Sequence, residues 1–283
     1  MGTLELRAPA KLNLWLRVIG RRPDGYHELD SLMVPIGLWD DVWLETGRNG
    51  ITCRCPGRPE LDGEHNLAAR AARSWLRASG REIGLNITIR KRIPVEAGLG
   101  GGSSDAAAVL RGLQRLARPG LSAARLAALA LELGADVPFF LREGPCLAAG
   151  VGERLEPVDI PPFWVILARP PFGLSTRRVF EHLKIPLTSA WDGVSRKSPL
   201  EGFARLATSL VNDLQPTAIA LQAGIGEVLE DLLWAGAAGA SMSGSGPTVF
   251  GLFRTRREAR AGLRRLERRS DWGYSVVPGF EAQ

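Results

Sequence analysis

The sequence is poor in cysteine and in long apolar runs. Its 283 residues include three cysteines, and Cys53 and Cys55 have no second pair or histidine cluster nearby, so we expect neither a disulfide framework nor a zinc site. No apolar run approaches the roughly 18 residues that a membrane-spanning helix needs. The first residues carry charges where a secretory signal needs an apolar segment, so we expect a cytoplasmic protein.

Lysine is also scarce, because only four of the 36 basic residues are lysines: Lys11, Lys91, Lys184 and Lys197. The compact lysine ammonium has uses that the planar arginine guanidinium lacks. Lys11 and Lys91 are therefore candidates for a functional role.

The excess of basic residues lies in one segment. Residues 254–269 hold eight arginines and two glutamates, a net charge of +6, so the rest of the chain sums to zero. Such a segment could contact nucleic acid or a membrane. However, Ala259, Leu263 and Leu266 recur at helical spacing and no aromatic residue lies among the arginines, which favours a solvated face of an amphipathic helix. We expect no nucleic-acid or membrane partner.

The hydrophobic periodicity predicts an α+β fold. The expected strands are 10–18 (half-buried), 28–36, 41–46, 50–55, 85–93, 163–170, 249–253 and 274–278, with a turn at 20–25. The expected helices are 65–78, 104–117, 122–133, 176–183, 200–220, 222–235 and 254–269. A segment rich in glycine and proline at 150–162 predicts a domain junction, with domains over residues 1–158 and 159–283.

The strongest local feature is the segment PVEAGLGGGSSDAAAVL at residues 94–110, which joins a predicted strand to a predicted helix. Its glycines expose backbone N–H groups beside the positive end of a helix, which favours an anion site and above all phosphate. Ser103 or Ser104 is the expected N-cap, with Asp105 in the first turn. The alternative is a flexible turn closed by an ordinary capped helix. The segment lacks the GK[ST] ending of a Walker A loop and fits the dinucleotide fingerprint poorly.

Three further features surround this loop. Lys91 shares a strand face with apolar residues, so it is either paired or functional, or it reaches solvent at the strand end. In LGADVPFF (133–140), Gly134 is the expected end of a helix and Pro138 is expected to stop its continuation, which would leave Asp136 near a negative helix end. That position suits a catalytic base, and a turn or N-cap aspartate is an equally good interpretation. The segment ASMSGSGPTVF (240–250) predicts a turn that feeds a strand.

These motifs, taken in order with APAKLNLWL and DGYHEL near the N-terminus, resemble the GHMP kinase superfamily over residues 8 to 253. The resemblance implies an N-terminal domain like ribosomal protein S5 domain 2 and a ferredoxin-like C-terminal domain. It implies ATP-dependent phosphorylation, with Mg²⁺, of the 2-hydroxyl of 4-diphosphocytidyl-2-C-methyl-D-erythritol in non-mevalonate isoprenoid synthesis. It leaves the oligomeric state open between a monomer and a weak homodimer.

The resemblance also assigns residues to roles. Asp136 is implied as the catalytic base and Lys11 as its partner. The implied ATP-binding residues are Asn66, Lys91, Pro94, Val95, Glu96, Ala97, Gly98, Leu99, Gly100, Gly101, Gly102, Ser103 and Ser104. The implied substrate-binding residues are Asn13, Tyr26, His27 and Phe180, and the surroundings of Phe180 match less well. Ser104 is a possible Mg²⁺ ligand, and no glutamate is assigned. The rivals are a homoserine or mevalonate type of kinase and, in a different class, a nucleic-acid-binding protein.

Overall fold

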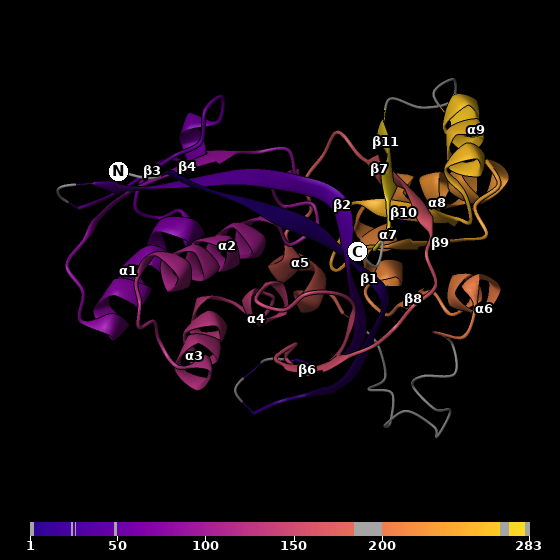
Figure 1. Ribbon diagram of the computed structural model, residues 1–283. Helices are drawn as coiled ribbons and strands as arrows, with labels where there is room; N and C mark the ends of the chain where they lie inside the picture. The colour runs from indigo at the N-terminus through magenta and orange to yellow at the C-terminus, as the bar shows by residue number, and fades with distance from the viewer. Residues whose placement is uncertain are drawn as a thin grey trace. The chain divides into compact units, whose positions relative to one another are not determined.

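The computed structural model describes residues 3–23, 25, 27–47, 50–183, 200–266 and 272–280. Tyr26 lies outside the described residues, as do Lys184 and Lys197. By their contacts the residues divide into two compact units, one of residues 1–10, 38–95 and 100–143, the other of residues 11–37, 96–99 and 144–283. Two long strands, β1 (Thr3–Arg21) and β2 (His27–Gly47), contribute residues to both units (Figure 1). The units are interleaved along the chain, and the domain bounds 1–158 and 159–283 stay a prediction.

The first unit contains the start of β1, which pairs with β2, together with the end of β2 and two short strands. Residues 41–47 of β2 run antiparallel to β4 (Gly84–Arg90), which pairs on its other side in parallel with β3 (Ile51–Arg54). Leu85, Ile87 and Ile89 alternate with more exposed residues along β4 and are buried. This period-two pattern places one face of the strands against the helices of the unit.

The helices of this unit are α1 (Leu67–Ser79), α2 (Gly101–Leu116), α3 (Ala123–Leu133), the short α4 (Val137–Phe140) and the single 3-10 turn η1 (Pro59–Leu61). Runs of buried alanines on α1 and α2 let these two helices pack closely. Gly112 brings α2 onto the strands, since a Cβ at this position would lie 2.3 Å from the Leu44 side chain. The α2 helix is therefore held in place by packing.

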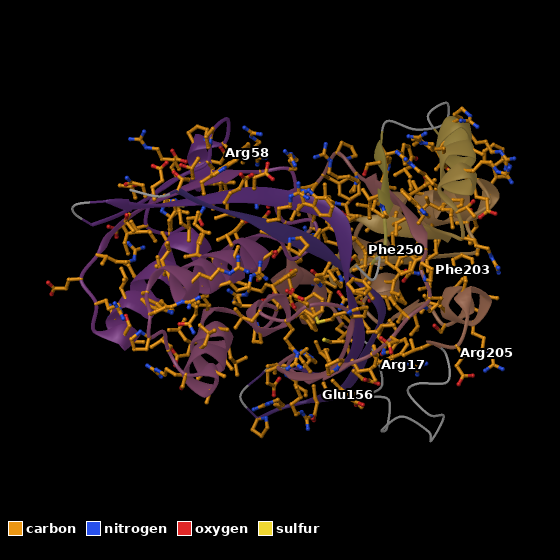
Figure 2. The ribbon with its side chains drawn as sticks, viewed as in Figure 1. Arg17, Arg58, Glu156, Phe203, Arg205 and Phe250 are labelled. Atoms are coloured by element: carbon orange, nitrogen blue, oxygen red, sulfur yellow. The ribbon has the colours of Figure 1, made fainter. Side chains whose placement is uncertain are left out.

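The second unit contains a four-stranded antiparallel sheet in the order β11 (Gly273–Pro278), β7 (Trp164–Arg169), β10 (Val249–Phe253) and β9 (Gly239–Met242). Two helices, α8 (Gly224–Trp234) and α9 (Arg256–Leu266), contact each other and this sheet (Figure 1). Figure 2 shows Phe250 of β10, which is fully buried, and Arg205 of α6 (Phe203–Thr208), which is exposed. An antiparallel sheet with two packed helices agrees with the ferredoxin-like expectation.

The rest of this unit surrounds the other portions of β1 and β2. The strand β8 (Val211–Asn212) runs parallel to β1, while β5 (Cys146–Gly150) pairs with β2 and with β6 (Arg154–Pro157). The remaining helices are α5 (Thr176–Glu181), α6 (Phe203–Thr208) and α7 (Gln215–Leu221). The mixture of antiparallel strands and separate helices in both units confirms the α+β class.

Several strand predictions are wrong in their limits or burial. The predicted strands 28–36 and 41–46 are parts of one continuous strand, β2. The predicted half-buried strand 10–18 is buried on both faces, because the alternate positions of Lys11, Asn13 and Trp15 are covered as well as the leucines. Strands β5, β6, β8 and β9 were not predicted, because they are short and their alternation is weak.

The predicted helix 200–220 is also wrong, because it is divided into α6, β8 and α7. The side chain of Asn212 in β8 caps the break by accepting a hydrogen bond from Leu214 N–H at 2.9 Å. The amphipathic helix predicted over 254–269 is confirmed for its described part, since Ala259 and Leu266 of α9 are buried and the α9 arginines are exposed. Among the described residues, none of the helices has the length and apolar character needed to traverse a bilayer.

Candidate active site

Three polar side chains form a buried chain on β1 and β2 in the second unit. The Lys11 Nζ donates to Asn13 Oδ1 at 2.5 Å, and Asn13 Nδ2 donates to Ser31 Oγ at 2.7 Å. Ser31 Oγ donates in turn to the Trp15 carbonyl at 2.7 Å. Lys11, Asn13 and Ser31 are each at most 4% exposed. Lys11, which was assigned to catalysis, and Asn13, which was assigned to substrate binding, are thus joined by a hydrogen bond. The buried Lys11 ammonium lies at one end of this series of side chains.

A glycine-rich turn lies against these hydrogen-bonded side chains. Residues 243–248 connect β9 to β10, which confirms the predicted turn that feeds a strand. A Cβ at Gly244 would lie 3.4 Å from Lys11 Nζ and 3.5 Å from Asn13 Oδ1. Because Gly244 has a positive φ of 58° and little space around it, glycine is favoured there on two grounds. The turn therefore brings backbone close to the Lys11 ammonium.

The same turn contacts the middle of the glycine loop. Ser243 Oγ donates to the Gly98 carbonyl at 3.0 Å, and a Cβ at Gly98 would lie 2.2 Å from the Ser243 carbonyl oxygen. Lys11 N–H donates to the Leu99 carbonyl at 2.9 Å. Residues 96–99, which belong to the second unit, are thus fixed between β1 and the 243–246 turn.

Asn212 holds this turn and was missed by the sequence reasoning. Its Nδ2 donates to the carbonyls of Met242 at 2.7 Å and Gly244 at 2.8 Å. Asn212 itself is aligned with Leu16 of β1. The only signal in the sequence was an asparagine inside a predicted helix, a residue type that favours caps and turns over helix interiors.

The start of α2 differs from the prediction. The N-cap is Gly100 with a φ of 71°, and no side chain caps the helix, so neither Ser103 nor Ser104 is the N-cap. Both serines lie in the first turns of the helix, and Asp105 lies beyond the first turn. Ser104 Oγ is buried and has no hydrogen-bond partner among the described residues. A buried hydroxyl without a partner is costly and points to a ligand atom that would complete it.

The rest of the loop turns sharply. Pro94 and Val95 follow β4, and Val95 is exposed. Glu96 has a φ of 53°, in the left-handed region that disfavours side chains other than glycine, and Ala97 follows it. Such backbone strain is found preferentially at functional sites, which agrees with a binding role for this loop.

Lys91 is paired, so the alternative that it reaches solvent is wrong. Its Nζ lies 2.5 Å from Asp40 Oδ2 and 2.6 Å from Asp105 Oδ2, and all three side chains are buried. Burial lowers the pKa of Lys91, but the two carboxylates outweigh it and leave this pKa above its usual value. Burial raises the pKa of Asp105 to about 8, with Asp40 adding to the rise and Lys91 opposing it.

Asn66, the other residue assigned to the adenine nucleotide, is the N-cap of α1. Its Oδ1 accepts from Ala68 N–H at 2.9 Å, and its Nδ2 donates to the Leu61 carbonyl at 2.8 Å and towards Cys55 Sγ at 3.6 Å. The described hydrogen bonds thus give Asn66 a local structural role, which leaves its contact with a nucleotide a prediction.

Asp136 lies between two helices. Gly134 is the C-cap of α3, as expected, but Pro138 does not stop a helix, since it lies in the first turn of α4. Asp136 is the N-cap residue of α4 and makes no side-chain capping hydrogen bond. The position directly after the carbonyl end of α3 agrees with the expectation for a base, and the N-cap position agrees with the structural alternative. The assignment of Asp136 stays a prediction.

Two of the residues assigned to cytosine are brought together. The rings of His27 and Phe180 are stacked with centroids 4.9 Å apart and an interplanar angle of 24°. Burial lowers the pKa of His27, with the positive charge of Arg21 as the second cause. The imidazole is therefore mainly neutral at pH 7, with one nitrogen as donor and the other as acceptor. Such a group can recognise the edge of a base.

The three cysteines all lie in the described part of the chain. Cys53, Cys55 and Cys146 are free and buried. In the described part of the chain, no group of three or more His, Cys, Asp or Glu side chains is arranged to hold a metal ion. Ser104, which was predicted as a possible Mg²⁺ ligand, has a buried hydroxyl oxygen, an atom type that suits a hard cation such as Mg²⁺.

Comparison with known families gives two matches. Residues 66–144 match the family described as GHMP kinases N terminal domain, and residues 195–270 match the family described as GHMP kinases C terminal. The first match contains Asn66, Lys91, the glycine loop and Asp136.

Relatives of known name cover nearly the whole chain. A protein of Geobacter metallireducens called 4-diphosphocytidyl-2-C-methyl-D-erythritol kinase is 46% identical over 98% of this chain and 99% of its own length. A protein of the same name from Anaeromyxobacter dehalogenans is 48% identical over 95% of this chain and 87% of its own length.

Solved structures agree with the two-domain fold. A crystal structure called 4-(cytidine 5'-diphospho)-2C-methyl-D-erythritol kinase is 38% identical, with a TM-score of 0.83, and covers 98% of this chain and 100% of the other. A homoserine kinase from Cytophaga hutchinsonii is 20% identical with a TM-score of 0.73 over 99% of this chain and 95% of the other, which shows a shared fold alone. The chain therefore belongs to the GHMP kinase family and, within it, to the group of the 4-diphosphocytidyl-2-C-methyl-D-erythritol kinases.

Proposed function

We propose that this enzyme transfers the γ-phosphoryl group of ATP to the 2-hydroxyl of 4-diphosphocytidyl-2-C-methyl-D-erythritol, a step in the non-mevalonate synthesis of isoprenoid precursors. The observation that carries the proposal is the match to relatives of this name, at 46% and 48% identity, over nearly the whole chain. The residues discussed above supply a physical account of how the transfer could proceed.

The acceptor is a tertiary alcohol, which is crowded and weakly acidic. In the proposed reaction Asp136 accepts the hydroxyl proton, the oxygen attacks the γ-phosphorus, and ADP leaves. Lys11 neutralises the charge that develops during the transfer, and Asn13 fixes the Lys11 ammonium through the 2.5 Å contact. Catalysis of this kind depends mainly on positioning and charge neutralisation.

The triphosphate is assigned to the glycine loop. The N–H groups in the first turn of α2 point out of the N-terminal end of the helix, and the positive charge of that end favours an anion. Mg²⁺, which accompanies ATP in kinases and prefers oxygen ligands, would be held in part by Ser104 Oγ, which is buried and has no hydrogen-bond partner among the described residues. When bound, it would neutralise charge on the phosphates.

The cytidine part of the substrate is assigned to Tyr26, His27 and Phe180. A base can stack on the Phe180 ring, and the neutral His27 imidazole can hydrogen-bond to its edge. The stacking of His27 on Phe180 in the structure supports a shared site for these two side chains. The part of Tyr26 in this site remains a prediction from the family resemblance.

We also propose a cytoplasmic location, because the three cysteines are free and buried, as a reducing compartment requires. The choice between a monomer and a weak homodimer stays a prediction. The exposed arginines of α9 are interpreted as a solvated helix face, and no nucleic-acid partner is proposed.

The proposal is tested by incubating the purified protein with ATP, Mg²⁺ and one of three acceptors: 4-diphosphocytidyl-2-C-methyl-D-erythritol, homoserine or mevalonate. We expect ADP and a phosphorylated product with the first acceptor only, identified by ³¹P NMR. Turnover of homoserine or mevalonate at a higher kcat/KM would overturn the substrate assignment. A salt-dependent mobility shift of DNA or RNA without any kinase activity would support the nucleic-acid alternative.

A further inference from the structure

A buried trio of one lysine and two aspartates, Lys91, Asp40 and Asp105, lies in the first unit, and only its lysine has been assigned to ATP. We propose that Asp40 and Asp105 are positioning residues for nucleotide binding, which hold the Lys91 ammonium beside the first turn of α2. This inference rests on the proposed function, since it assumes that ATP binds at the glycine loop.

The contacts of the trio join three separate segments. Asp40 belongs to β2, Lys91 follows directly after β4, and Asp105 belongs to α2. The two Nζ to Oδ2 distances are 2.5 Å to Asp40 and 2.6 Å to Asp105, and the exposed fraction of the Lys91 side chain is 7%. A lysine side chain that pairs with two buried carboxylates loses its rotational freedom, so its ammonium is fixed in one place.

That place is beside the glycine loop. A Cβ at Gly101, the first residue of α2, would lie 3.4 Å from Lys91 Nζ and 2.9 Å from Ile93 Cγ2. The loop backbone can approach the ammonium this closely because position 101 has no side chain. The positive charge of Lys91 is thus added to the positive end of α2, where the proposed triphosphate binds.

The two aspartates have different roles. Asp40 uses both carboxylate oxygens, because its Oδ1 also accepts from the N–H groups of Arg92 at 2.5 Å and Ile93 at 2.8 Å. It therefore fixes the backbone that leads from β4 into the loop. Asp105 Oδ1 is buried and has no hydrogen-bond partner among the described residues, so Asp105 contributes only its contact with Lys91.

The test is calorimetric titration of a non-hydrolysable ATP analogue, with Mg²⁺ constant, into the wild-type protein and into Asp105→Ala, Asp105→Asn and a control, Asp41→Asn. Asp41 is the neighbour of Asp40, but its carboxylate pairs with Arg92 and Arg90 instead. We expect Asp105→Ala to raise Kd for the analogue about tenfold at pH 7, and Asp105→Asn, which keeps a neutral polar partner for Lys91, to restore most of that loss. The control should bind like the wild type.

The rescue by Asp105→Asn and a comparison of the two ligands separate positioning from a merely structural role. Binding of 4-diphosphocytidyl-2-C-methyl-D-erythritol, measured in the same way, should change little in any variant. The inference is overturned if Asp105→Ala binds the analogue as tightly as the wild type, or if it weakens both ligands equally. If the wild type itself fails to bind the analogue, the proposed function fails instead.

Discussion

The Lys11 ammonium and the Asn13 side-chain oxygen are 2.5 Å apart, and Asn13 uses its amide nitrogen to reach Ser31. Asn13 thus connects the proposed catalytic cation to the neighbouring strand. We expect Asn13→Ala to lower kcat by at least tenfold, because the Lys11 ammonium loses the partner that fixes it. Ser31→Ala is the matched control, since it removes the hydroxyl at the far end of this hydrogen-bonded series and leaves the contact between Lys11 and Asn13.

Steady-state kinetics and urea unfolding of these two variants check the prediction. Both variants remove a buried hydrogen-bond partner, so each should lose about 1–3 kcal/mol of unfolding free energy. Only Asn13→Ala should lose most of its kcat. An equal loss of kcat in both variants would mean that the hydrogen bonds of Asn13 and Ser31 support the fold rather than the reaction.

Asp136→Asn should lower kcat by about a hundredfold or more, which is the usual cost of losing a general base. The substitution keeps the size of the side chain, so we expect the variant to fold. Rates and thermal unfolding measured on the same preparation are sufficient. Near-normal turnover of a folded Asp136→Asn protein would remove the base assignment and favour the interpretation of Asp136 as an N-cap residue.

The difference between Gly101 and Gly102 gives a test of the loop. A Cβ at Gly101 would collide with Ile93 at 2.9 Å and approach Lys91, whereas a Cβ at Gly102 meets nothing within 4 Å. Gly101→Ala should therefore raise KM for ATP by about an order of magnitude and leave KM for the acceptor nearly unchanged. Gly102→Ala should leave the fold intact or stabilise it by about 0.5–1 kcal/mol, because alanine is the better helix former.

The two alanine variants are compared by varying each substrate in turn and by recording thermal unfolding. If Gly101→Ala raises both KM values and lowers the unfolding midpoint, the effect is a general distortion of the loop. If Gly101→Ala and Gly102→Ala raise KM for ATP equally, direct contact with the backbone matters more than the packing against Lys91.

The sequence predicted the glycine-rich turn before α2 and the turn that feeds β10, because each depends on a local pattern, and it left the pairing of Lys91 open. It did not predict that β1 would be buried on both faces, since burial of Lys11 and Asn13 requires Ser31 and Gly244, which come from distant parts of the chain. Period-two alternation describes only one covered face.

The positions where helices begin and are interrupted also could not be predicted from local sequence patterns. Serine is a better N-cap than glycine by propensity, yet α2 begins at Gly101, where the absence of a side chain allows the approach of Ile93 and Lys91. Similarly, Asn212 interrupts a predicted helix because its amide holds the carbonyls of Met242 and Gly244, which are some thirty residues away. Tertiary contacts override local preference at both places.

Phe180→Ala should raise KM for 4-diphosphocytidyl-2-C-methyl-D-erythritol by about one to two orders of magnitude, since stacking of a base on an aromatic ring contributes about 1–3 kcal/mol. KM for ATP should barely change. His27→Ala should reduce the preference for the cytidine form of the substrate over the uridine form, because hydrogen bonds to the base edge determine that choice. A parallel rise of both KM values in Phe180→Ala would mean that the stack with His27 only supports the fold.

The raised pKa of Asp105 also affects the stability of the folded protein. In the unfolded chain this carboxyl ionises near its ordinary value of 3.8, whereas in the folded protein its pKa is about 8. Between these values the folded state retains a proton that the unfolded state releases, so the contribution of Asp105 to the free energy of unfolding decreases as the pH rises. It is fully present below about pH 4 and is lost as the pH passes about 8.

Asp105→Asn removes this contribution, because its amide does not titrate. We expect the free energy of unfolding in urea to decrease more steeply between pH 5 and 8 in the wild type than in Asp105→Asn. The free energy of unfolding of Asp105→Asn minus that of the wild type should therefore increase as the pH rises from 5 to 8. Equal slopes in the wild type and Asp105→Asn would show that Asp105 ionises alike in the folded and unfolded states, and that the two carboxylates share the Lys91 charge without a retained proton.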